Sequence, residues 1–261
     1  MDNTVMIPTQ EILSAADLID EAVERLIRAC SNIGPLGRYE ADVECRNLLV
    51  LVIRHSEGFT VLARRDLVSL PSAMVICRAA FETAVKILWM LDPDDPFERE
   101  ARWLAHLDTE VRFQCKIASH LGKSDLSEKT NAGAILRQFH SSVAQRLPAG
   151  YAVPRQLPNL FEMLKALGEE AKYSVYLVGC QYAHSTHFAT GLYRKHQGTM
   201  KTHGESIKAE DWWTGFSMIW YALHASGHRF LAKTGGKPAD FLSAEFATRV
   251  QDAVNALRGN H

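Results

Sequence analysis

The sequence predicts an all-α protein that folds as a single bundle of about eight to nine helices. Apolar residues recur at helical spacing along most of the chain, and no segment alternates with a period of two between turn signals. The chain has 261 residues, of which 47% are hydrophobic, enough for one sizeable core. We therefore expect a single helical domain over residues 1–261.

Turn and capping signals divide the chain into its predicted helices. Prolines and glycines close the first two, in SNIGPLG and DLVSLPS. The start of the fourth is well marked, because Asp95 can cap it, Pro96 suits its first position and Glu98 follows three residues after the cap. The predicted helices run approximately over residues 8–30, 38–65, 71–91, 96–121, 126–146, 159–167, 171–192, 207–233 and 243–257.

Two segments interrupt the helical pattern. The stretch RLPAGYAVPRQLPN contains three prolines, so we expect a proline-rich excursion over residues 147–158 within one domain. The stretch YRKHQGTMKTHGES, residues 193–206, is predicted to be the longest loop. Its Arg194 and Lys195 could contact the phosphates of RNA or of a nucleotide, and a solvated loop is the alternative.

Charge and cysteine usage bound the class of protein. Lysine and arginine number 29 against 30 aspartate and glutamate residues, so no overall field attracts nucleic acid or an anionic membrane. The five cysteines form no C-x-x-C pair, which argues against a disulfide framework and a thiolate zinc site. The first residues, MDNTVMIPTQEILSA, lack the basic end and apolar run of a signal peptide. We expect a cytoplasmic location and no membrane partner.

The longest apolar window, SAMVICRAAFETAVKILWML, contains a stripe of charged residues. Arg78, Glu82 and Lys86 follow one another at four-residue spacing on the predicted third helix. Their burial in lipid would be costly, so the window does not predict a membrane span. One interpretation of the stripe is a solvated edge with weak ion pairs. The other is a cleft, since Val75 and Trp89 share the arc, in which arginine would bind a phosphate or carboxylate.

A second set of polar residues belongs to the predicted helix over residues 171–192. A helical wheel places four of them on one side, namely Tyr173, Tyr176, His184 and His187. Two histidines three residues apart can both approach one metal ion, although zinc usually needs at least three protein ligands. The metal and any cofactor stay unknown.

A histidine pair on another predicted helix could complete such a site. The stretch WYALHASGH places His224 and His228 one helical turn apart, on the same face as Trp220. If the two helices pack antiparallel, four imidazoles could converge. The alternatives are that these histidines are hydrogen-bonded interface residues, or that they serve acid/base chemistry or ligand recognition.

The segment HSEGFTVLARRDLVSLPSAMVICRAAFETAVKILWML resembles a group of uncharacterised bacterial helical proteins known only as domains of unknown function. The shared pattern is H-x-E, an apolar helix, a small turn and R-x-x-F-E, and it matches His55, Glu57, Arg78, Phe81 and Glu82. A later tyrosine-rich helix with a histidine also fits, at Tyr173, Tyr176 and His184. The resemblance covers approximately residues 45–190 and implies an all-helical fold.

Some such families are similar to HEPN domains, whose nuclease members carry an arginine and a histidine four to six residues apart on one helix. The nearest pairs that we note are Arg102 and His106, with three residues between them, and Arg46 and His55, with eight. The chain departs from the nuclease pattern in this respect. It also lacks P-loop, dinucleotide-binding, zincin and hydrolase-elbow motifs.

These patterns lead us to expect a binding or accessory protein whose central cleft recognises a small anionic ligand or a nucleic-acid segment. The cleft would be lined by Arg78, Glu82, Tyr173, Tyr176, His184 and His187. One alternative is a HEPN-like ribonuclease or another metal-assisted or acid/base hydrolase, whose catalytic residues would be Arg78, Glu82, His184 and His187. The other alternative is a structural helical homodimer.

Overall fold

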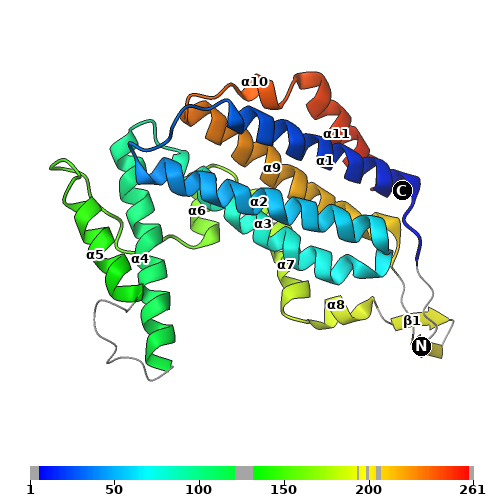
Figure 1. The fold of residues 1–261 in the computed structure, drawn as a ribbon. Coiled ribbons are helices and arrows are strands. Elements are labelled where there is room, and N and C mark those ends of the chain that lie inside the picture. The colour runs from blue at the N-terminus through cyan, green and yellow to red at the C-terminus, as the bar shows by residue number, and fades with distance from the viewer. Residues whose placement is uncertain (1–5, 121–131, 193, 198–199, 204–206, 259–261) are drawn as a thin grey trace.

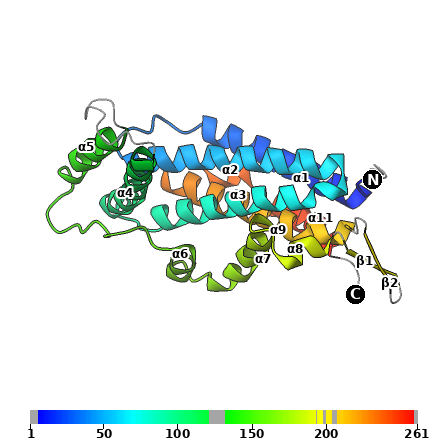
Figure 2. The same cartoon turned by 90° about the horizontal axis from the view of Figure 1, so that it is seen from below.

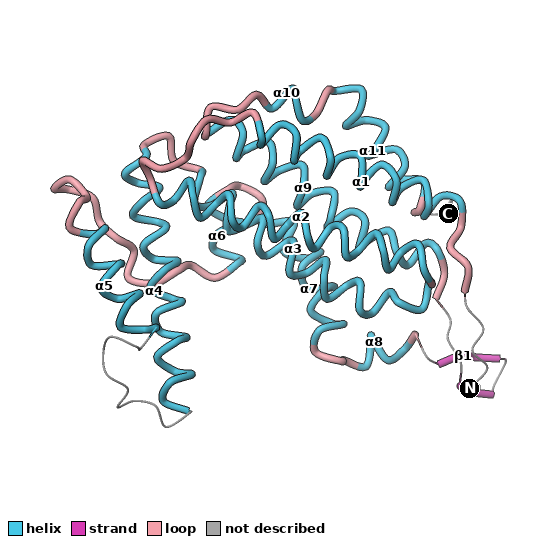
Figure 3. The backbone as a smooth tube through the Cα atoms, in the orientation of Figure 1, coloured by secondary structure: helices cyan, strands magenta, loops and turns pink. Residues whose placement is uncertain are grey.

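A computed structural model of the chain describes residues 6–120, 132–192, 194–197, 200–203 and 207–258. Within these ranges the fold consists of eleven α-helices, a few short 3₁₀ turns and one small two-stranded hairpin (Figure 3). The prediction of an all-α bundle is confirmed.

Four long helices form the body of the protein and run side by side (Figure 1, Figure 2). They are α1 (Gln10–Ser31), α2 (Glu40–Arg65), α3 (Leu70–Leu91) and α9 (Trp213–Lys233). Most residues of α3 are buried, and its last five, Ile87 to Leu91, are buried without exception. A helix that is apolar around most of its circumference packs inside a core. No described helix combines the length and apolar character needed to cross a membrane.

The C-terminal helices α10 (Pro238–Phe241) and α11 (Ala244–Ala256) cover α1 and α9 (Figure 1). The side chain of Ser243 caps α11 by accepting a hydrogen bond from the Phe246 backbone N–H at 3.1 Å. Phe246, Val250 and Val254 then recur at helical spacing and are all buried. An apolar stripe on an otherwise polar helix therefore closes this side of the core.

At one end of the body, α4 (Pro96–His120) pairs with α5 (Ala132–Ala144). The first part of α4 packs against α2 and α3, and the rest of the pair projects from the body (Figure 1). The predicted start of α4 is confirmed, because Asp95 Oδ1 accepts a hydrogen bond from the Phe97 N–H at 2.8 Å. The buried residues of α4 lie in its first two thirds, up to Val111. The remainder of α4 exposes apolar side chains such as Phe113.

Three shorter helices lie below the body in Figure 1: α6 (Leu160–Ala166), α7 (Tyr173–Ala183) and α8 (His187–Gly191). Both α6 and α7 contact α3. Residues 147–158, which lead into α6, contain no helix, in agreement with the predicted excursion. Asn159 and Glu162 form a reciprocal capping box that starts α6.

The prediction of one continuous helix over residues 171–192 is wrong. α7 ends at Ala183 and α8 begins at His187. Between them, Ser185 adopts a left-handed backbone conformation with φ 51°, which an α-helix does not contain. The Thr186 hydroxyl donates a hydrogen bond to the Gln181 side-chain oxygen at 2.7 Å and so holds the turn.

The segment predicted as a long loop contains a β-hairpin instead. Strand β1 (Arg194–Gln197) pairs antiparallel with β2 (Met200–His203), with Arg194 opposite His203. The structure describes only the backbone of these strands. The prediction that Arg194 and Lys195 bind a ligand through their side chains therefore lies outside the described part.

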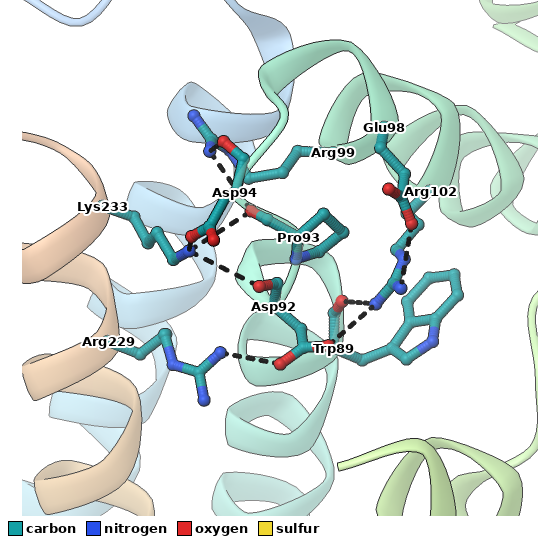
Figure 4. A network of polar contacts seen from close by, with 9 residues as sticks. All are labelled: Trp89, Asp92, Pro93, Asp94, Glu98, Arg99, Arg102, Arg229 and Lys233. Atoms are coloured by element: carbon teal, nitrogen blue, oxygen red, sulfur yellow. Dashed lines mark hydrogen bonds and ion pairs between the residues drawn. The ribbon is translucent and has the colours of Figure 1, made fainter. Parts of the chain in front are cut away.

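A polar network joins the C-terminal end of α3 to α9 and α4 (Figure 4). Arg229 on α9 donates a hydrogen bond to Asp92 Oδ1 at 2.9 Å, and Lys233 pairs with Asp94. On the other side, Arg102 of α4 donates to the Trp89 carbonyl at 2.6 Å. The turn over residues 92–95 thus fixes three helices relative to one another.

The closest approach of α9 to α2 and α3 depends on Gly215. A Cβ at this position would lie 2.9 Å from Phe59 Cε2 and 3.3 Å from Met74 Sδ, and both side chains are buried. We expect Gly215→Ala to lower the free energy of unfolding by about 1–2 kcal/mol, because overpacking exceeds the gain in helix propensity. Urea denaturation followed by circular dichroism measures the change.

Gly58→Ala is the matched control, since Gly58 is also inside a helix but a Cβ there would meet only Ile76 Cδ1, at 3.8 Å. This substitution should raise the free energy of unfolding by about 0.5–1 kcal/mol. Equal effects of the two substitutions would contradict the packing of α9 described above.

Candidate functional site

The charged stripe of α3 meets α7 in a closed set of polar contacts that we call the Arg78 triad, formed by Arg78, Glu82 and Tyr176. Arg78 Nε donates a hydrogen bond to Glu82 Oε1 at 2.8 Å, as their four-residue spacing on one helix predicts. Arg78 Nη2 donates to the Tyr176 hydroxyl at 3.2 Å. The triad therefore joins Arg78 and Glu82 of α3 to Tyr176 of α7, three residues that the sequence predicted for the site from two separate helices.

Small and aromatic residues bring α7 against α3. A Cβ on Gly179 would lie 3.2 Å from Arg78 Cβ, so a larger residue would push the two helices apart. The rings of Phe81 and Tyr176 stack with centroids 6.4 Å apart, and Tyr173 lies 5.5 Å from Tyr176. Tyr173 thus packs its ring against the triad and does not line the pocket described below, so its predicted contact with a ligand stays a prediction.

The electrostatics of the triad keep Tyr176 protonated. Burial raises the pKa of the Tyr176 phenol, and its contacts with Cys180 and Glu82 raise this pKa further. Since the phenol stays neutral near pH 7, it keeps a proton that can serve as a hydrogen-bond donor. The guanidinium of Arg78 has a raised pKa as well, because the contacts with Tyr176 and Glu82 outweigh its partial burial.

A pocket of about 250 Å³ lies beside the triad. Its lining residues are Arg78, Glu82, Lys86, Leu157, Pro158, Leu160, Met163 and Tyr176. The polar ones come from α3 and α7, whereas the apolar ones come from residues 157–163. Lys86 is half-buried, and its ammonium has no hydrogen bond or ion pair with any residue that the structure describes.

The histidines of QYAHSTHF are not part of this pocket. His184 follows α7 as its C-cap residue, His187 is the first residue of α8, and both are exposed. The break at Ser185 removes the common helix face on which their pairing was predicted. Neither residue lines the pocket beside Arg78 and Glu82.

The predicted convergence of four histidines is also wrong. Among the described residues, no group of three or more histidine, cysteine, aspartate or glutamate side chains could hold a metal ion. On α9, His224 and His228 are exposed, and the ring of His224 stacks on Trp220 with centroids 5.1 Å apart. Although His224 reaches the surface, partial desolvation of its ring lowers its pKa, and so does the neighbouring His228.

A second polar cluster, between α2 and α4, was not predicted from the sequence. Arg99 is 7% exposed, lies 3.4 Å from Asp42 Oδ1 through its Nε, and donates a hydrogen bond to the Asp94 carbonyl at 3.1 Å. Glu100 is 5% exposed and accepts a hydrogen bond from the Glu40 N–H at the start of α2. His106 lies 3.6 Å from Glu44. On sequence grounds these residues are typical of a solvated helix face, and only the tertiary fold buries them.

Glu100 caps α2 in surroundings that disfavour its charge. Burial raises the pKa of its carboxyl to about 7, although the hydrogen bonds from the backbone of Glu40 and Ala41 lower this pKa. The negative charges of Glu40 and Asp42 raise this pKa too. The second oxygen, Oε2, is buried and has no hydrogen-bond partner in the described part of the chain.

The fold and the pocket thus define an all-helical protein with a cationic pocket between its central helix and the segment that follows the proline-rich excursion. The chain belongs to a family of unknown function, DUF5677, whose sequence profile matches residues 45–201, more than half of the chain. All residues of the Arg78 triad and of the pocket lie in this range, and so do His55 and Glu57. Comparisons with curated proteins and with solved structures gave no significant match.

The raised pKa of Glu100 predicts a pH dependence of stability. The folded chain holds this proton up to a pH of about 7, whereas an unfolded chain loses it near 4.5, so the stabilising contribution declines as the pH rises between these values. We expect Glu100→Gln to remove this decline and to be more stable than wild type at pH 8, by up to about 3 kcal/mol. Chemical denaturation at pH 4, 6 and 8 measures the effect.

The control is Glu98→Gln, which removes an exposed carboxylate from the same helix. Its unfolding free energy should follow the wild-type pH profile. If the profile of Glu100→Gln is parallel to that of wild type, the Glu100 carboxyl does not retain its proton on folding.

Proposed function

We propose that this chain is a binding or accessory protein whose pocket beside the Arg78 triad recognises a small anionic ligand. The observation that carries the proposal is Lys86, a half-buried lysine whose ammonium has no partner among the described residues, in a pocket that also contains Arg78. The stem of such a lysine packs against the protein while its charge is left to water, and an anionic ligand would supply the partner that the protein does not.

The charges lining the pocket support an anion. Arg78 and Lys86 carry two positive charges against the single negative charge of Glu82. Glu82 lies 2.8 Å from Arg78 and neutralises it, so Lys86 is the cation that is left for a ligand. The overall charge of the chain is −1, which makes this local excess the source of attraction.

A small molecule fits the pocket better than a nucleic-acid segment. A volume of about 250 Å³ is near the lower limit for small-molecule sites. Nucleic-acid recognition normally uses several phosphate contacts along an extended basic surface.

We also retain the prediction of a reducing cytoplasm, in keeping with five cysteines that form no disulfide.

A panel of anions tests the proposal. We expect at least one of inorganic phosphate, acetate and hexanoate to bind with one-to-one stoichiometry at millimolar concentration, as followed by chemical shifts of the ¹⁵N-labelled chain. Lys86→Gln should weaken this binding at least tenfold, because it removes the unpaired charge. Lys165→Gln, on the exposed face of α6 and outside the pocket, is the matched control and should bind as wild type does. The proposal is abandoned if no anion of the panel binds the wild-type chain.

The alternative of a HEPN-like ribonuclease has one observation in its favour. Arg99 and His106 lie on α4 with six residues between them, a spacing that matches HEPN nucleases when the intervening residues are counted, as for the two pairs named above. Arg99, however, is buried and already paired with Asp42. We therefore expect the purified chain to leave single-stranded RNA intact in a gel assay. Cleavage that disappears in His106→Ala, with an unchanged circular dichroism spectrum, would favour the nuclease.

A further inference from the structure

We infer that the ligand of this pocket is a small amphipathic monocarboxylate, with its carboxylate at Lys86 and its apolar body against residues 157–163. The inference rests on the proposed function and names the chemical class that the site would take. Three properties of the pocket support the inference. One side is charged and the other is apolar, the charged residues have a net charge of one, and the volume is small.

The pocket has one charged side and one apolar side. The side formed by residues 157–163 consists of Leu157, Pro158, Leu160 and Met163. Met163 is buried, and the two leucines are half-buried and pack against the core, so this side is a fixed surface. A ligand that is polar throughout would desolvate its own polar atoms against this surface without gaining hydrogen bonds. An apolar body would instead remove further apolar surface from water.

The free charge of the pocket matches a single carboxylate. Arg78 donates to Glu82 through Nε and to Tyr176 through Nη2, and its charge is shared with Glu82, although N–H groups on Nη1 and Nη2 stay available. Lys86 supplies the charge that no described acidic residue neutralises. A monoanion would bring the net charge of the lining residues to zero. A phosphate dianion would leave one excess negative charge among the lining residues.

The backbone does not provide the usual alternative for phosphate. Phosphate groups often bind the free N–H groups at the start of a helix. α6 begins at the pocket, but Glu162 N–H donates to Asn159 Oδ1 at 3.0 Å and Asn159 N–H donates to Glu162 Oε2 at 2.9 Å. The capping box thus already occupies backbone donors at this helix start. In the site that we infer, the charges that hold the anion are therefore those of the side chains.

The size of the pocket sets the size of the ligand. An apolar cavity of about 150 Å³ can accept benzene. A pocket of about 250 Å³ therefore has room for an apolar body of about six carbons together with a carboxylate. Straight-chain and aromatic acids of this size share the chemistry that the pocket would recognise.

A series of carboxylates of increasing length tests the inference on the full chain. Each methylene that is buried should strengthen binding up to about fourfold, so hexanoate should bind at least tenfold more tightly than acetate. Inorganic phosphate should bind more weakly than hexanoate, and so should 1-hexanol, which lacks the charge. The dissociation constants come from chemical shifts of the ¹⁵N-labelled chain. Because the series uses the wild-type chain, its outcome does not depend on whether a variant folds.

Variants then locate the two ends of the ligand. Lys86→Gln should weaken hexanoate at least tenfold and leave 1-hexanol unchanged, whereas Lys165→Gln should change neither. If phosphate and acetate bind as tightly as hexanoate and all require Lys86, the amphipathic ligand is excluded while the anion pocket stands. If hexanoate and 1-hexanol bind equally and independently of Lys86, the carboxylate has no role and the inference fails. If no anion binds, the inference and the proposed function fail together.

Discussion

The burial of α3 is the constraint on which the rest of the structure depends. Its 22 residues contain only three charged side chains, Arg78, Glu82 and Lys86, at four-residue spacing. Four helices pack around α3, namely α2, α9, α6 and α7. The charged side chains of the stripe therefore need either polar partners or access to solvent. Arg78 and Glu82 find each other and Tyr176, and the stripe opens into the pocket. The position of the candidate site is therefore a consequence of how the core closes.

The pocket and the projecting α4 are tied to the same short turn. Asp95 caps α4 through the Phe97 N–H, and its other carboxylate oxygen accepts a hydrogen bond from Tyr151 in the excursion that leads to the apolar side of the pocket. One residue before it, Asp94 pairs with Lys233 of α9. The apolar side is thus anchored to the end of the central helix, although it is more than 60 residues away in sequence. Such long-range connections distinguish a fixed pocket from a loop that merely passes over the surface.

The sequence predicted what depends on local geometry and missed what depends on the tertiary fold. The pairing of Arg78 with Glu82 follows from helical spacing alone, and Tyr176 was placed in the site from the face of its own helix. The histidine face was wrong because a helical wheel assumes a continuous helix, and the turn at Ser185 breaks it. Leu157 and Met163 could not be assigned to the pocket, since no periodicity relates them to α3. Glu100 and Arg99 have the pattern of surface residues, and the packing of α4 on α2 alone buries them.

Two lysines of this fold differ in whether they have acceptors, and this difference is the basis of the proposal for Lys86. The Lys233 side chain is 17% exposed, and its ammonium is satisfied by the Asp94 carboxylate and by the carbonyls of Asp92 and Pro93. The same chain thus provides acceptors where a partly buried lysine serves to join helices. Lys86 has none among the described residues, yet it projects from the most buried helix of the protein. A methionine at this position would satisfy packing without the desolvation of a charge. The proposed recognition of an anion would require a cation at this position, and packing alone would not.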